Sequence, residues 1–238
     1  RGPLDGGRPM SAVVWAAALL VLLPVAFNVA FAMLASTFDY PDVLRRPTHE
    51  VLALFRDGGR KLVLLWWGFA LTAVALVPLA VLVTAALPDS DATLRTLATT
   101  VGVLAGAVQF LGLVRWPFLV PYLAATSVDA TPERREAVDM VFQSFNRCLG
   151  VAIGEHLGYL FTGAWTALVG VLAVQSSAAP TWLGILGVLV GILLAVCSLE
   201  FVGRGGDDEG WSIAATITPF VYVAWSVWLV ALGVALLL

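Results

Sequence analysis

The chain has 238 residues, of which 60% are hydrophobic and 12% are charged, and its formal net charge at pH 7 is −3. Soluble domains carry roughly 45–50% apolar and 25% charged residues, so a single soluble core could not bury this much apolar surface. The negative net charge argues against a nucleic-acid-binding protein, which needs a basic face. We therefore expect an integral membrane protein that interacts with membrane lipids and not with nucleic acid.

Six apolar segments are each long enough to cross about 30 Å of hydrocarbon, which takes roughly 20 helical residues. Leu, Ala and Val dominate these segments and strand-like alternation is absent, which predicts helices and not a β-barrel. We expect an all-α polytopic bundle that forms one transmembrane domain over residues 1–238. The predicted transmembrane helices are Met10–Ser36, Lys61–Leu87, Leu94–Thr126, Leu149–Val174, Thr181–Val202 and Trp211–Leu238.

The first segment follows Arg8, which raises the alternative of a signal peptide. Its apolar run is too long for one, contains Pro24 and Asn28, and is not closed by a small-residue cleavage site. We expect it to be a helix of the mature protein.

The loop after this segment has a helical pattern of its own. Residues 48–56 follow Pro47, carry several apolar side chains, and end before the pair Gly58 and Gly59. This pattern fits a short interfacial helix on the cytoplasmic membrane surface, and an ordinary connector fits it equally well.

The distribution of Lys and Arg predicts the orientation. The second loop contains Arg95, the fifth contains Arg204, and the fourth contains neither Lys nor Arg. The basic residues of the first and third loops are Arg45, Arg46, Arg56, Arg60, Lys61, Arg134 and Arg135. Because positive loops stay inside, we expect the odd-numbered loops to be cytoplasmic and both termini to be extracytoplasmic, in a bacterial inner membrane.

The fourth predicted helix carries a stripe of small residues. Gly150, Gly154 and Gly158 repeat at four-residue spacing, which lets transmembrane backbones approach closely. Thr131 followed by Pro132 is a good helix start, and nothing breaks the helical pattern between it and the apolar segment. We expect a long, central fourth helix that begins in the cytoplasm.

Polar side chains converge in the cytoplasmic half of the predicted bundle. Glu155 and Tyr159 are four residues apart and share a helix face, whereas His156 points about 100° away from Glu155. We predict Glu155, His156 and Tyr159 as candidate catalytic residues. The candidate ligand-binding residues are Arg115, Trp116, Gln109, Asn146, Arg147, Asn28, Glu200 and Tyr222.

Each of these groups has a structural alternative. A charge inside a bundle costs at least about 2.5–3.5 kcal/mol on insertion scales, so an Arg115–Glu155 ion pair would explain both residues without any function. A histidine in the position of His156 more often stabilises helix packing than takes part in catalysis. The functional alternative is that Arg115 binds an anionic group and Glu155 exchanges a proton with a ligand.

No metal or cofactor site is predicted. The two histidines have no companion at metal-ligand spacing, which argues against a metal centre or a bis-histidine haem. Cys148 and Cys197 fall in or at the edge of helices and are expected to be unpaired.

Three strings carry a family resemblance. They are "TFDYPDVLRRPTHEVLALF" from Thr37, "QFLGLVRWPFLVPYLA" from Gln109, and "FNRCLGVAIGEHLGYLFTGAWT" from Phe145. Together they resemble a family of small six-helix bacterial membrane proteins, domain of unknown function 4386, over nearly the whole chain. The resemblance implies a fold and a location but no activity.

Three functions fit these observations. The first is an intramembrane acid–base enzyme, isomerase-like or cyclase-like, that acts on an isoprenoid- or lipid-like substrate in a pocket in the cytoplasmic half. The second is a non-catalytic protein that binds a lipid, another hydrophobic ligand or a partner. The third is a small-molecule transporter, which the lack of an internal repeat disfavours. The oligomeric state and the identity of the ligand do not follow from the sequence.

Overall fold

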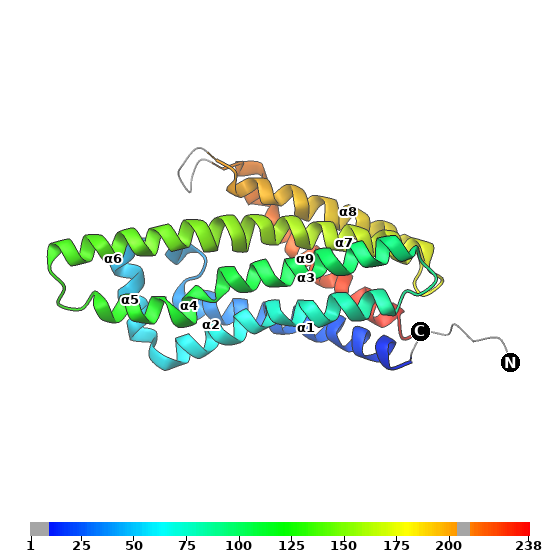
Figure 1. The fold of residues 1–238 in the computed structure, drawn as a ribbon, viewed down its shortest axis with the longest axis horizontal. Helices are drawn as coiled ribbons and strands as arrows, with labels where there is room; N and C mark the ends of the chain where they lie inside the picture. The colour runs from blue at the N-terminus through cyan, green and yellow to red at the C-terminus, as the bar shows by residue number, and fades with distance from the viewer. Residues whose placement is uncertain (1–9, 204–209) are drawn as a thin grey trace.

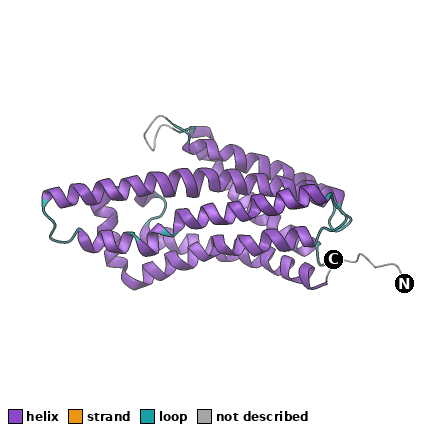
Figure 2. Ribbon diagram, in the orientation of Figure 1, coloured by secondary structure: helices purple, strands orange, loops and turns teal. Residues whose placement is uncertain are grey.

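The computed structural model describes residues 10–203 and 210–238. Helices make up nearly all of the described chain, which contains no strand (Figure 2). They are α1 (Met10–Phe38), η1 (Asp42–Arg45), α2 (Thr48–Ala85), α3 (Ala92–Leu113), α4 (Arg115–Phe118), α5 (Val120–Thr126), α6 (Pro132–Phe145), η2 (Asn146–Leu157), α7 (Gly158–Gln175), α8 (Thr181–Cys197), η3 (Ser198–Phe201) and α9 (Ser212–Ala235). Arg8, which precedes the first predicted helix, and Arg204 of the fifth loop lie outside the described residues.

Six helical stretches of the described chain are long and apolar enough to cross a membrane. They are Ser11–Phe38, Thr48–Ala85, Ala92–Thr126, Pro132–Gln175, Thr181–Phe201 and Ser212–Ala235. This finding confirms the predicted all-α fold and a multi-pass membrane protein.

The fourth stretch is much longer than a membrane crossing requires. Thr131 caps its first turn, with its hydroxyl accepting a hydrogen bond from the Arg134 amide at 3.4 Å. Its 44 residues correspond to about 66 Å at 1.5 Å per residue, roughly twice the thickness of the hydrocarbon core. The α5–α6 hairpin therefore extends past one end of the bundle (Figure 1).

The spans form a ring in chain order. α1 packs on α2, α2 on α3, α3 on α7, α7 on α8, and α8 on α9, and α9 returns to α1. Figure 1 shows these helices running roughly along the long axis of the molecule. Such a ring leaves its interior to be filled by side chains or by a cavity.

Two buried clusters fill most of this interior. One lies in the half of the bundle that contains the α2–α3 and α7–α8 turns, and it includes Trp165 and Trp228. The other lies in the opposite half, between α1, α2 and the α4–α6 region, and is built around Trp66 and Trp116. Their rings stack with centroids 4.4 Å apart.

Helix α2 changes direction at Gly59, whose φ of 54° is a left-handed conformation that favours glycine. The turns before it bury Val51, Leu52 and Phe55 in the cluster around Trp116. This apolar face, expected to lie on a membrane surface or to be a plain connector, thus packs against protein.

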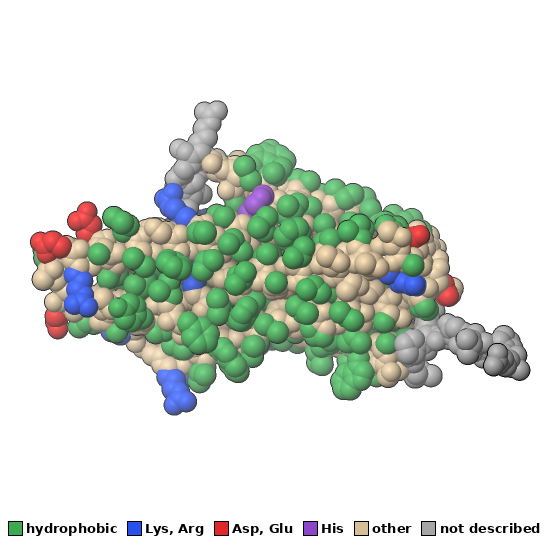
Figure 3. Space-filling view, viewed as in Figure 1, with side chains coloured by type: hydrophobic (Ala, Val, Ile, Leu, Met, Phe, Trp, Pro, Cys, Tyr) green, Lys and Arg blue, Asp and Glu red, His purple; other side chains and the backbone are tan. Residues whose placement is uncertain are grey.

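The surface has a broad apolar band. In the view of Figure 3, hydrophobic side chains cover the middle of the molecule and charged side chains gather toward the two ends of the long axis. This distribution is that of a protein whose middle lies in hydrocarbon.

Candidate functional site

A π-helical segment brings the glycine stripe against α3. Hydrogen bonds in the π-helix η2 join residues five apart and not four, so residues four apart lie nearly above one another. An ideal Cβ on Gly154 would lie 2.8 Å from the Cα of Gly112, and one on Gly158 would lie 3.0 Å from the Cγ of Gln109. The absence of these Cβ atoms is what lets the two helices touch.

At Gly150, the remaining glycine of the stripe, the neighbour across the contact is the side chain of Arg115. A Cβ on Gly150 would lie 2.5 Å from the Nη2 atom of Arg115, so the glycine makes room for the guanidinium. Nη2 donates to Asn146 Oδ1 at 2.9 Å and Nη1 donates to the Gly112 carbonyl. The buried guanidinium thus has two oxygen partners other than Glu155.

The break between α3 and α4 positions this arginine. Pro117 has no amide hydrogen, so the regular helical bond to the residue four positions earlier is lost there. The Arg115 side chain folds back along α3 toward Gly112 and lies 5.3 Å from the centroid of the Trp116 ring.

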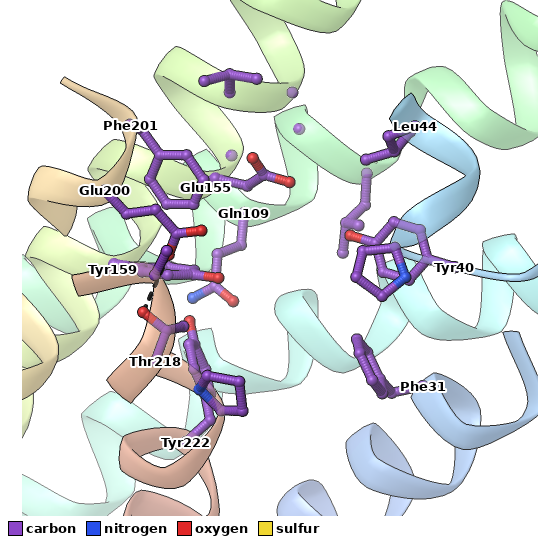
Figure 4. A pocket seen from close by; sticks show the side chains of 18 of the residues that line it. Phe31, Tyr40, Leu44, Gln109, Glu155, Tyr159, Glu200, Phe201, Thr218 and Tyr222 are labelled. Atoms are coloured by element: carbon purple, nitrogen blue, oxygen red, sulfur yellow. Dashed lines mark hydrogen bonds between the residues drawn. The ribbon is translucent and has the colours of Figure 1, made fainter. Parts of the chain in front are cut away.

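A cavity of about 540 Å³ opens beside this contact. Its wall combines residues of α1, the loop that carries η1, α2, α3, α4, η2, α7, η3 and α9. Figure 4 shows Glu155, Tyr159 and Gln109 on one side of the open space, and Phe31, Tyr40 and Leu44 on the other. The carboxylate of Glu155 points into this space.

Eight of the eleven predicted site residues line this cavity. They are Glu155, Tyr159, Arg115, Gln109, Asn146, Asn28, Glu200 and Tyr222. These residues come from segments far apart in the sequence, so the structure gathers them in one place.

The other three predicted residues lie outside the lining. His156 is half-buried, and its Nδ1 lies 2.9 Å from the Ser198 carbonyl oxygen, which joins η2 to η3. Trp116 is buried in the aromatic cluster, stacked on Trp66. Arg147 is exposed. The role proposed for His156 from the sequence therefore has no support from its position.

Hydrogen bonds hold several polar side chains of the wall. Gln109 Nε2 donates to the Thr162 hydroxyl at 2.8 Å, which fixes the amide against α7. Glu200 Oε2 accepts a hydrogen bond from the Thr218 hydroxyl at 3.0 Å (Figure 4). Asn28 Nδ2 donates to the Pro24 carbonyl at 2.7 Å.

A belt of aromatic rings forms part of the wall, and five of its members, Tyr40, Phe31, Phe69, Phe27 and Phe201, were not predicted from the sequence. Successive ring contacts, with centroids 4.9 to 6.1 Å apart, connect the members of this belt. A further contact, between Phe31 and Phe69 with ring centroids 6.4 Å apart, joins the pair of Phe31 and Tyr40 to the other rings of the belt. The belt consists of Tyr40, Phe31, Phe69, Phe27, Tyr222, Tyr159 and Phe201.

Tyr40 is the member of the belt that lies in a loop, between α1 and η1. Burial raises the pKa of its phenol above the ordinary value, the charge of Glu155 acts in the same direction, and Arg115 opposes it. The phenol is therefore neutral at physiological pH and is available as a hydrogen-bonding group. Aromatic residues in loops are common, so no local signal marked this one.

The cavity wall offers acid–base and hydrogen-bonding groups within an apolar frame. Within the described residues, no group of three or more His, Cys, Asp or Glu side chains is placed to hold a metal ion. Carboxyl and phenol groups on one helix face, opposite aromatic rings, suit a ligand with a polar end and an apolar body.

Comparison with known proteins gives a family and no activity. The family model described as Domain of unknown function (DUF4386) matches residues 15–233. No curated protein and no solved structure matches the chain.

Proposed function

Because the chain belongs to the family described as Domain of unknown function (DUF4386), whose description names no activity, we propose its function from the cavity. The protein binds a lipophilic, isoprenoid- or lipid-like molecule with the polar end of that molecule in the cavity, and Glu155 transfers a proton to or from it, as in an isomerase or a cyclase. The observation that carries this proposal is the shared placement of Glu155 and Tyr159 on the wall of a cavity that also carries a belt of aromatic rings.

The size and composition of the cavity support a small-molecule ligand. Ligand sites are typically about 300–1,000 Å³, mostly apolar, with a few placed polar groups, and this cavity of about 540 Å³ has that character. A carboxyl group is a competent general acid or base when it lies within hydrogen-bond reach of the reacting atom. The neutral phenol of Tyr40 and the amide of Gln109 are suited to orienting the ligand.

The cavity lies in the half of the bundle that we assign to the cytoplasmic side. Its loop residues Tyr40, Pro41, Leu44 and Arg45 come from the first, positively charged loop. Under the positive-inside rule, this placement puts both termini outside a bacterial inner membrane and makes the cavity accessible from the inner leaflet.

Binding without chemistry is the second candidate function. Two observations favour it: Glu200 is held by a neutral hydroxyl of Thr218, and His156 is directed at a backbone carbonyl and not at the cavity. The same cavity would then hold the ligand for a sensor or an accessory protein. Transport has less support, because none of the described lining residues comes from the turns at 86–91 or 176–180.

Native mass spectrometry, with chromatographic identification of the extracted molecules, tests the proposal. Wild type is compared with Glu155→Gln and with Glu136→Gln, a matched control because Glu136 is exposed on α6. We expect wild type and the control to carry the same product mixture, and Glu155→Gln to carry an unconverted precursor. Retention of an unchanged mixture by Glu155→Gln would favour binding alone, and no co-purified molecule in wild type would overturn the proposal.

A further inference from the structure

Helices α1 and α9 pack tightly in the half of the bundle away from the cavity. An ideal Cβ on Gly233 would lie 2.9 Å from the Cβ of Leu20 and 3.0 Å from the carbonyl oxygen of Ala17. Gly233 thus brings the two backbones close together, and this part of the ring is closed to the surrounding lipid.

Nearer the cavity, side-chain contacts connect the two helices. Asn28 Nδ2 donates to the Ser226 hydroxyl at 3.0 Å, and the rings of Phe27 and Tyr222 stack with centroids 6.1 Å apart. Phe27, Asn28 and Tyr222 line the cavity at the junction of α1 and α9.

Beyond these contacts, the two helices turn to different partners. Phe31 of α1 packs on Tyr40 and Phe69, at 5.6 and 6.4 Å between ring centroids. Thr218 of α9 donates instead to Glu200 of η3. Figure 4 shows Phe31 and Tyr222 on opposite sides of the open space.

Several residues in this region both line the cavity and reach the outside of the protein. Val223 is 59% exposed and Phe31 is 36% exposed, and Ala215 and Pro219 are also exposed. These exposed wall residues place an opening between α1 and α9, and the exposed wall residues Pro41 and Arg45 place a second one at the first loop. Both helices are long and apolar enough to cross a membrane, so in a bilayer the opening between them would face lipid.

We propose that the opening bordered by Phe31 on α1 and by Pro219 and Val223 on α9 is the entrance through which the ligand arrives from the membrane. The hydrocarbon chain of a membrane amphiphile lies in this opening, and its polar end reaches Glu155. This inference rests on the proposed function, because it assumes that the cavity binds a lipophilic molecule. It adds the route of entry and the chemical class: a membrane-embedded amphiphile with a chain.

The apolar border and the polar interior fit this occupant. The border residues are hydrophobic, and the carboxyl group of Glu155 and the amide of Gln109 lie across the open space from Phe31 (Figure 4). A water-soluble ligand would gain nothing from an entrance in the apolar surface, whereas a lipid chain stays in contact with hydrocarbon along the whole path.

Photocrosslinking tests the entrance. The protein is placed in vesicles of phosphatidylethanolamine and phosphatidylglycerol that contain a phosphatidylglycerol with a diazirine in its acyl chain, and the labelled residues are mapped by mass spectrometry. Phe69 is the reporter, because it lines the cavity and yet is only 3% exposed. We expect label on Phe69 in wild type and loss of this label in Val223→Trp, which fills the opening.

Val227→Trp is the matched control. Val227 lies one turn further along α9, is 63% exposed, and is not part of the cavity lining. It should keep the label on Phe69. Ala215→Trp, on the same border as Val223, is a second blocking variant in case Val223→Trp lowers the melting temperature.

The outcomes separate this inference from the proposed function. Undiminished label on Phe69 in both blocking variants overturns the entrance but leaves the cavity as a lipid site. Absence of label on Phe69 in wild type also overturns the entrance, and the molecules extracted from wild type then decide independently whether the cavity binds a ligand.

Discussion

Gly150 and Arg115 share one space: a Cβ added to the glycine would lie 2.5 Å from Nη2 and 2.7 Å from Cζ of the guanidinium. The two residues belong to η2 and α4 and are 35 positions apart in the sequence. The glycine is therefore required by the arginine. A buried guanidinium at this place needs both a neighbour without a side chain and acceptors for its N–H groups.

The first prediction is that Gly150→Ala destabilises the protein. The added methyl group forces the guanidinium away from Asn146, and overpacking of this kind typically costs about 1–3 kcal/mol. Thermal unfolding in detergent should show a lower melting temperature. Gly68→Ala is the control, because a Cβ on Gly68 meets nothing within 4 Å, and it should leave the melting temperature unchanged or raise it. Equal melting temperatures for the two variants would contradict this view of Gly150.

The second prediction concerns the hydrogen bond between Arg115 and Asn146. Asn146→Leu removes the acceptor 2.9 Å from Nη2 and leaves a buried guanidinium with fewer partners, at a cost of about 1–3 kcal/mol. Arg115→Met should also destabilise the protein. The double variant should cost less than the sum of the two single variants, because each single variant already breaks the hydrogen bond between them. If the stability loss of the double variant equals the sum of the two single losses in melting or denaturant experiments, the two side chains do not act together.

These predictions depend on parts of the site that the sequence indicated in advance. The four-residue spacing of Gly150, Gly154 and Gly158 predicted a helix contact, and the structure has that contact against α3. The spacing of Glu155 and Tyr159 predicted one shared face, and both residues line the cavity. Periodicity within a helix is a local property, so a sequence pattern reveals it.

Other parts of the site depend on tertiary contacts and were not predictable in this way. The acceptor for His156 is the backbone carbonyl of Ser198, which no residue type encodes. The position of Tyr40 opposite Glu155 follows from how the first loop folds over the bundle (Figure 4). The π-helical geometry of η2 has no sequence signature comparable to a capping box or a proline kink.

A third prediction concerns the orientation in the membrane. In a background with Cys148→Ser and Cys197→Ala, Glu136→Cys reports on the α5–α6 end and Ser177→Cys on the α7–α8 turn; both positions are exposed. Because the first and third loops carry most of the Lys and Arg, a membrane-impermeant maleimide added to intact cells should label Ser177→Cys and not Glu136→Cys. The same reagent should label both after the cells are lysed. Labelling of Glu136→Cys in intact cells would reverse the assigned orientation.

The last prediction compares two buried tryptophans in matched surroundings. Trp165 and Trp228 are 0% and 1% exposed, and each packs against a glycine, Gly102 and Gly187 respectively. Trp228 Nε1 donates to the Leu183 carbonyl at 2.9 Å, whereas Trp165 Nε1 is buried without a hydrogen-bond partner.

Replacement of either tryptophan by phenylalanine removes a similar volume, so the packing costs should be comparable. Trp228→Phe also removes a hydrogen bond between α8 and α9 that is worth about 0.5–1.5 kcal/mol, whereas Trp165→Phe removes a donor that gains nothing in the folded state. Trp228→Phe should therefore lower the free energy of unfolding by more than Trp165→Phe. Denaturant titration of the two variants in the same detergent measures the difference, and a larger loss for Trp165→Phe would mean that packing against Gly102 outweighs the hydrogen bond of Trp228.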